Sequence, residues 1–145
     1  MARVLIAEDD ENIRTLIELA FDEYETIVAA DGAQALTLLD GARFDAAVLD
    51  VMMPGVTGFE VLTAIRTHPR HAKVPVVMVT AKTSESDHIE GFQRGADAYV
   101  TKPFMPNELV ATVEELLSMS WEARSRQRDS EKDRAEFLRR LERRF

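Results

Sequence analysis

The sequence contains no cysteine, which excludes disulfide bonds, zinc–thiolate sites and cysteine nucleophiles. It also lacks any apolar run approaching the roughly 20 residues that a membrane-spanning helix needs. The N-terminal segment MARVLIAEDD does not have the layout of a signal peptide. These absences predict a cytoplasmic protein without a membrane segment. With 145 residues, the chain has room for one domain and a short extension, but not for an additional DNA-binding domain.

Positive charge is scarce in most of the chain. Residues 1–117 hold 20 Asp and Glu against 9 Lys and Arg, whereas residues 118–145 hold 6 against 9. Because the acidic part would repel nucleic-acid phosphates, we expect no direct contact with nucleic acid. The basic end intersperses Glu with Arg, a pattern typical of a solvated helix.

Short runs of Val, Ile, Leu and Ala alternate with longer amphipathic stretches. Most of these runs are apolar at nearly every position, as in strands that are covered on both faces. The stretches between them repeat apolar residues at helical spacing. This order predicts an α/β fold of the (βα)5 type, with a parallel sheet and right-handed crossovers. The predicted strands are residues 4–7, 26–29, 46–49, 76–80 and 98–101.

The segment 118–145 has neither glycine nor proline and is dense in helix formers. It is predicted to be a charged helical extension that continues the fifth helix, with Trp121 serving in packing. Three roles are open: a linker to an output domain, a dimerising or partner-binding helix, or a segment folded back on the domain. Because its apolar residues are sparse and widely separated, a homodimer or linker helix is favoured over folding back.

Polar side chains stand at four predicted strand ends. The acidic triplet 8–10 follows the first strand, Asp50 the third, Thr80 ends the fourth and Lys102 follows the fifth. Ligands of open parallel sheets bind outside these carboxyl ends. Crowded carboxylates need a cation, and Mg²⁺ accepts oxygen ligands while leaving a position for a phosphate oxygen. With a hydroxyl and an ammonium opposite, the set indicates phosphoryl transfer to a carboxylate.

Helix capping is the alternative explanation for the acids of the first loop. Negative side chains are favoured at the first turn of a helix, and we assign Asp10 and Glu11 to that role. Asp50 differs, because it ends a buried run and precedes the loop VMMPGVTG rather than a helix.

Over residues 1–117 the chain resembles the receiver domain of bacterial two-component response regulators. The matching segments, in order, are VLIAEDD, VLDVMMPGVTGFE, VVMVTA and GADAYVTKPF. The resemblance implies a CheY-like, flavodoxin-like fold with strand order 2-1-3-4-5. It also implies a phosphorylation-dependent signalling switch rather than an enzyme, phosphorylated by a partner sensor histidine kinase or phosphotransfer protein.

The resemblance further implies which residues hold the metal ion. Mg²⁺ would be bound by Asp9, Asp50 and the backbone carbonyl of Met52, with Glu8 as an acidic neighbour. The chain's three histidines show no metal-ligand spacing and are expected at the surface.

It implies a phosphorylation site as well. Asp50 would accept the phosphoryl group, and Thr80 and Lys102 would bind its oxygens. Tyr99 would change orientation with the state, so that the surface of the fourth helix, fifth strand and fifth helix repacks to control a partner or output.

The lifetime of the phosphoryl group depends in this family on the residues two positions after Asp50 and Thr80. Here they are Met52 and Lys82, and neither is an obvious orienter of attacking water. We therefore expect slow self-dephosphorylation.

Three other functions are alternatives. A flavodoxin would need a first loop that accepts a phosphate, and the acidic triplet 8–10 would repel one. A haloacid-dehalogenase-type phosphatase would need a second Asp at the place of Met52. A degenerate receiver that binds proteins without being phosphorylated remains a further alternative.

Overall fold

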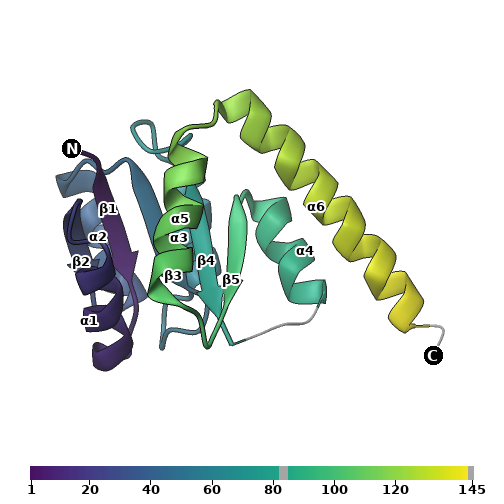
Figure 1. Cartoon of the computed structure of the whole chain (residues 1–145), viewed down its shortest axis with the longest axis horizontal. Helices are drawn as coiled ribbons and strands as arrows, with labels where there is room; N and C mark the ends of the chain where they lie inside the picture. Colours follow the sequence, from purple (N-terminus) through teal and green to yellow (C-terminus); the bar gives the residue numbers. More distant parts are fainter. Residues whose placement is uncertain (82–84, 144–145) are drawn as a thin grey trace.

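The computed structural model describes residues 1–81 and 85–143. Its centre is a five-stranded parallel sheet of order β2-β1-β3-β4-β5, so the predicted fold class and strand order are confirmed (Figure 1). The strands are β1 (Arg3–Ala7), β2 (Glu25–Ala29), β3 (Ala46–Asp50), β4 (Val76–Thr80) and β5 (Ala98–Thr101).

Helices cover both faces of the sheet. Because side chains alternate between the faces along each strand, one strand contributes to two hydrophobic clusters. In β1, Val4 and Ile6 belong to one hydrophobic cluster, together with buried residues of α1 (Glu11–Ala20) and α5 (Pro106–Leu117). Leu5 and Ala7 belong to the opposite cluster, with α2 (Gly32–Gly41) and α3 (Gly58–Thr67). The helix α4 (Glu85–Arg94) contacts α3.

The helix boundaries follow local sequence signals. Asp10 caps α1, because its carboxylate accepts a hydrogen bond of 3.0 Å from the backbone N–H of Ile13, as predicted. Asp31 caps α2 in the same way through Gln34. Gly95 follows α4 with φ of 102°, a left-handed conformation that glycine adopts without a steric penalty.

The C-terminal segment forms a separate helix, α6 (Trp121–Glu142), so the predicted continuation of the fifth helix is wrong. The break has a local cause. The Ser118 hydroxyl donates a hydrogen bond to the carbonyl of Glu115. Ser120 is extended, and its hydroxyl accepts a hydrogen bond of 3.0 Å from the backbone N–H of Ala123. Serine side chains that bond to nearby backbone groups favour helix ends over helix interiors.

The packing of α6 corrects a second expectation, because the helix folds back along α4 (Figure 1). The sparse apolar residues of this helix do not account for its packing by themselves. Two of the residues that α6 buries against the domain are Arg124 and Arg128, which form ion pairs with Asp97. Trp121 serves in packing, with its ring beside their guanidinium groups. Phe145 lies outside the described residues.

One histidine is also placed differently from the expectation. His71 is buried, stacks on Phe44 with ring centroids 4.1 Å apart, and forms hydrogen bonds through Nε2 with the carbonyls of Leu39 and Ala42. Burial lowers the pKa of His71, which favours the neutral ring. It is a core residue.

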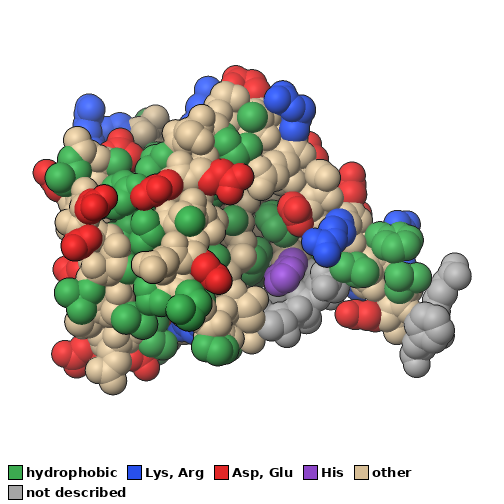
Figure 2. All heavy atoms as spheres, in the orientation of Figure 1, with side chains coloured by type: hydrophobic (Ala, Val, Ile, Leu, Met, Phe, Trp, Pro, Cys, Tyr) green, Lys and Arg blue, Asp and Glu red, His purple; other side chains and the backbone are tan. Residues whose placement is uncertain are grey.

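The acidic character of residues 1–117 is visible on the surface of the domain. Figure 2 shows Asp and Glu side chains spread over the face formed by α1 and α5. Among the described residues, no helix combines the length and apolar character needed to cross a membrane.

Candidate functional site

The carboxyl ends of the strands bring the predicted acidic residues together. Glu8 follows β1, and Asp50 is the last residue of β3. Glu8, Asp9 and Asp50 each place one carboxylate oxygen within 4.8 Å of the others. Asp9 is exposed, whereas Glu8 and Asp50 are only 1% and 3% exposed. We refer to this edge of the sheet, with Glu8, Asp9 and Asp50, as the acidic rim. It therefore holds two carboxylates with little access to water and a third beside them.

Lys102, directly after β5, is the cation of this rim. Its Nζ lies 2.8 Å from Oε1 of Glu8 and 3.5 Å from Oδ1 of Asp50. Burial by itself would lower the pKa of Lys102, but the interactions with Glu8 and Asp50 outweigh it and raise the pKa. The ammonium stays charged, and among residues 1–81 and 85–143 no other side-chain cation forms an ion pair with Glu8 or Asp50.

The pKa of Asp50 is raised to about 8, and burial is the largest cause. The hydrogen bond and the negative charge of Glu8 also raise it. Asp9 adds to the effect, and Lys102 opposes it. An ionised Asp50 therefore needs a further positive charge. The donor set consists of hard oxygen ligands, which suits Mg²⁺.

The loops hold the acids in place through backbone contacts. The N–H of Asp10 donates to Oε2 of Glu8 over 3.2 Å, and Arg14 donates to the Glu8 carbonyl over 3.0 Å. The Met52 N–H donates to Oδ1 of Asp50 over 3.2 Å. Sequence reasoning did not assign Arg14 this contact.

The first residue of α3 is a second contribution that sequence reasoning missed. Gly58 donates its N–H to the carbonyl of Val51 over 3.0 Å, and a Cβ at this position would overlap the carbonyl of Asp50. A glycine as the first residue of a helix, eight positions after the phosphoacceptor candidate, was the available signal.

Thr80 lies at the same edge, fully buried at the end of β4. Its carbonyl accepts a hydrogen bond of 2.8 Å from the backbone N–H of Lys102, so the two predicted phosphate-binding residues are joined through the backbone. Lys82, the other residue in the lifetime prediction, lies outside the described residues.

Tyr99 connects this edge to α4. It pairs in register with Met78 and belongs to the same face of the sheet, and by alternation Thr80 projects from that face as well. The Tyr99 ring stacks on His88, with centroids 4.6 Å apart, and meets Phe92 edge to face at 5.5 Å. The ring thus packs against α4.

A family model, the response regulator receiver domain, matches residues 4–114. The chain belongs to the response regulator receiver family. Receivers serve phosphorylation-dependent signalling in two-component systems, as the resemblance implied.

Relatives and solved structures agree with this assignment. The DNA-binding response regulator MtrA of Mycolicibacterium smegmatis is 38% identical over 138 residues, which are 94% of this chain and 55% of MtrA. The chain thus spans about half the length of the curated relatives it matches. Chemotaxis protein CheY4 of Vibrio cholerae superposes with a TM-score of 0.76 at 37% identity, covering 80% of this chain and 98% of CheY4.

A third match concerns the metal ion. The receiver domain of a sensor histidine kinase from Pseudomonas aeruginosa has a magnesium ion coordinated in its active-site cleft. It is 28% identical, with a TM-score of 0.74, and the match covers 81% of this chain and 98% of that domain. Receivers bind Mg²⁺ at an acidic site, and this chain has an acidic cluster of that kind.

These relatives correct the prediction that nucleic acid is excluded. That prediction rested on the acidic charge of residues 1–117, yet MtrA is a DNA-binding response regulator. The acidic charge of residues 1–117 is therefore no ground for excluding nucleic-acid binding. The relatives are response regulators rather than classical enzymes. The roles of single site residues, and the division of the chain at residue 117, remain predictions.

Proposed function

We propose that Asp50 accepts a phosphoryl group from a phosphorylated histidine of a partner sensor kinase or phosphotransfer protein in the cytoplasm. A carboxylate oxygen of Asp50 attacks the phosphorus, the phosphorus–nitrogen bond breaks, and its electron pair returns to the imidazole. The fully ionised product carries two negative charges at the end of β3, one more than the Asp50 carboxylate that attacked.

The oxygen ligands of Glu8, Asp9 and Asp50 support a Mg²⁺ requirement. We assign the ion to Asp9, Asp50 and the backbone carbonyl of Met52, with Glu8 beside them. When bound, Mg²⁺ supplies positive charge that offsets the repulsion between the carboxylates and the incoming phosphoryl group. The raised pKa of Asp50 supports this need.

Lys102 and Thr80 complete the proposed site. The ammonium of Lys102 already lies between Glu8 and Asp50, so it is positioned to pair with a phosphoryl oxygen. The hydroxyl of Thr80 would bond another oxygen, and Tyr99 would follow the movement of Thr80. The α4, β5 and α5 surface would then change shape and pass the signal to a partner or output.

The observation that carries this proposal is the convergence of two further carboxylates, Glu8 and Asp9, and one lysine on the buried Asp50. To test it, the protein is incubated with acetyl phosphate and Mg²⁺, and its intact mass is measured. We expect one phosphoryl group per chain in the wild type and none in Asp50→Asn. Asp40→Asn, which alters an exposed carboxylate, serves as the matched control and should load normally.

The metal requirement is tested in the same assay. Chelation of Mg²⁺, or the Asp9→Asn substitution, should slow loading at least about tenfold, which corresponds to a barrier increase of about 1.4 kcal/mol. Labelling that persists in Asp50→Asn would place the acceptor elsewhere. A wild type that never loads would favour the protein-binding module without phosphorylation.

A slow loss of the phosphoryl group is part of the proposal. The Met52 side chain is 56% exposed and apolar, so it offers no group to orient water toward Asp50. After removal of acetyl phosphate, the phosphorylated mass should persist for minutes or longer. Decay within seconds would contradict this part.

A further inference from the structure

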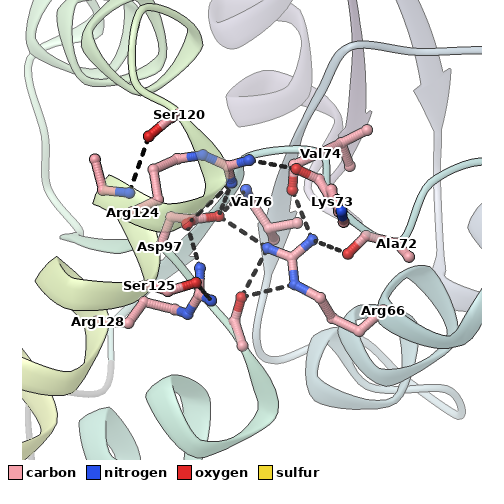
Figure 3. A network of polar contacts seen from close by, with 12 residues as sticks. Arg66, Ala72, Lys73, Val74, Val76, Asp97, Ser120, Arg124, Ser125 and Arg128 are labelled. Carbon is pink, nitrogen blue, oxygen red and sulfur yellow. Dashed lines mark hydrogen bonds and ion pairs between the residues drawn. The ribbon is translucent and has the colours of Figure 1, made fainter.

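The first turns of α6 are fixed to the domain by a buried charge cluster around Asp97 (Figure 3). The Asp97 carboxylate accepts hydrogen bonds of 2.8 Å from Arg66, 3.1 Å from Arg124 and 2.8 Å from Arg128. It also accepts a 2.8 Å bond from the backbone N–H of Val76. Two of the three arginines come from α6, so this cluster is complete only when α6 lies on the domain.

Neighbouring oxygen atoms and one aromatic ring offset most of the surplus positive charge of the cluster. Among the described residues, the buried Nε of Arg124 has no hydrogen-bond partner. Arg66 donates to the carbonyls of Gly95, Ala72 and Val74, and Arg124 donates to the carbonyl of Lys73. The Trp121 ring centroid lies 4.5–5.3 Å from the three guanidinium carbons. Burial lowers the pKa of Arg66 to about 10, so it remains charged at neutral pH.

The rest of α6 lies along α4 and buries few of its own side chains. Between residues 129 and 143, all of which the structure describes, Ala135 is the only buried residue. Phe137 and Leu141 stay exposed. A cavity of about 400 Å³, partly open to solvent, lies between this part of α6 and the domain. Its lining includes His88, Phe92 and Tyr99 from the domain and Glu131, Arg134 and Leu138 from α6. Protein interiors are normally close-packed, so this part of α6 can separate from the domain at lower cost than the Asp97 cluster.

Tyr99 lies at the point where this loose contact meets the phosphorylation site. Its ring forms part of the cavity wall below α6 and stacks on His88. There is no room for a Cβ at Gly91, because the ring of Tyr99 takes that space. Tyr99 and Thr80 project from the same face of neighbouring strands. Any movement of the Tyr99 ring toward Thr80 would therefore remove part of the surface on which α6 rests.

We propose that α6 is a phosphorylation-sensitive cover of the α4–β5 face. It is docked while Tyr99 stacks on His88. Phosphorylation of Asp50 draws Tyr99 away and loosens residues 129–143, while the Asp97 cluster keeps the start of the helix attached. This inference rests on the proposed phosphorylation of Asp50. Because coupling between two sites is reciprocal, detaching α6 must in turn favour the phosphorylated state.

Hydrogen exchange of the full-length protein tests the first half of the inference. The wild type and Asp50→Asn are treated with acetyl phosphate and Mg²⁺, and backbone exchange is followed by mass spectrometry. We expect severalfold faster exchange in residues 129–143 and in α4 of the phosphorylated wild type, and no change in Asp50→Asn. Unchanged exchange in protein whose intact mass shows the phosphoryl group would overturn the inference and leave the proposed function standing. Absence of the phosphoryl group from the wild type would overturn both.

The reciprocal half is tested by Ala135→Glu, which places a charge on the buried side of α6 without altering the Asp97 cluster. Ser130→Glu adds the same charge at an exposed position and is the matched control. We expect Ala135→Glu to raise the equilibrium extent of phosphorylation at limiting acetyl phosphate severalfold, and Ser130→Glu to behave as the wild type. Equal extents in all three proteins would overturn the coupling.

A second pair of variants covers the case in which Ala135→Glu does not fold. The double substitution Arg124→Gln and Arg128→Gln removes the α6 side of the cluster, and Arg126→Gln alters an exposed arginine of the same helix. Trp121 is the single tryptophan of the chain, so its emission reports the docking of α6. In the double variant alone, we expect both a red shift of the Trp121 emission maximum and increased phosphorylation. A red shift with wild-type phosphorylation would contradict the coupling.

Discussion

At the scale of single residues, the acidic rim is governed by how little water reaches Glu8 and Asp50. Both carboxylates are nearly buried and share the ammonium of Lys102. Folding therefore favours a proton on Asp50 over much of the neutral range, with a pKa of about 8. The sequence identified these acids from their places at strand ends, but the extent of their burial came from packing.

The raised pKa predicts that stability falls as pH rises. Between about pH 4 and pH 8 the folded protein binds more protons at Asp50 than the unfolded chain does, so the free energy of unfolding decreases across this window. Asp50→Asn cannot acquire this charge. In metal-free buffer the free energy of unfolding of Asp50→Asn should exceed that of the wild type by about 1–3 kcal/mol at pH 8. The difference should vanish near pH 4.

Thermal unfolding of both proteins at several pH values, with a chelator present, measures this difference. Adding Mg²⁺ at pH 8 should raise the Tm of the wild type and leave Asp50→Asn nearly unchanged, because the ion binds the folded site. A stability difference that does not vary with pH would contradict the assignment of the raised pKa to Asp50.

At the scale of elements, the start of α3 determines the geometry of the loop after Asp50. Gly58 lies so close to the carbonyl of Asp50 that a side chain cannot be placed between them. Thr57 caps the helix by accepting a hydrogen bond of 3.3 Å from the N–H of Glu60. The helix and the phosphoacceptor candidate are therefore fixed relative to each other through backbone atoms.

We expect Gly58→Ala to destabilise the protein by about 2 kcal/mol or more, because the contact is with backbone atoms that cannot rotate away. Gly41→Ala is the matched control, since the Cβ at this position of α2 would meet no atom within 4 Å. The control should be neutral or slightly stabilising. Urea unfolding followed by circular dichroism compares the variants, and equal stabilities would contradict the close contact at Gly58.

At the scale of the whole molecule, the basic C-terminal helix and the acidic domain are joined through one buried aspartate. Asp97 also bonds to the N–H of Val76, so the cluster links α6, α3 and the start of β4. The superposition with CheY4 covers 80% of this chain and 98% of CheY4, so α6 is an addition to the shared fold.

A chain shortened to residues 1–119 should therefore fold and lose stability, by about 2–4 kcal/mol, because Asp97 keeps Arg66 but loses both arginines of α6. Denaturant unfolding of the shortened and full chains measures the loss. Full-length Arg126→Gln, altered at an exposed position, should match the wild type. Equal stability of the shortened chain would contradict the α6 contact, and failure to fold would make α6 part of the core.

The sequence by itself determined the alternation of strands and helices, the cap at Asp10 and the acids at the strand ends, because these follow from local pattern. The strand order came from the resemblance to the receiver family. Asp10 and Gly95 needed no tertiary information, since a cap and a left-handed turn involve only neighbouring residues. The course of α6 was decided by tertiary structure. Arg124 and Arg128 look solvated in the sequence, and only the burial of Asp97 beside β4 makes their charges a reason for the helix to fold back.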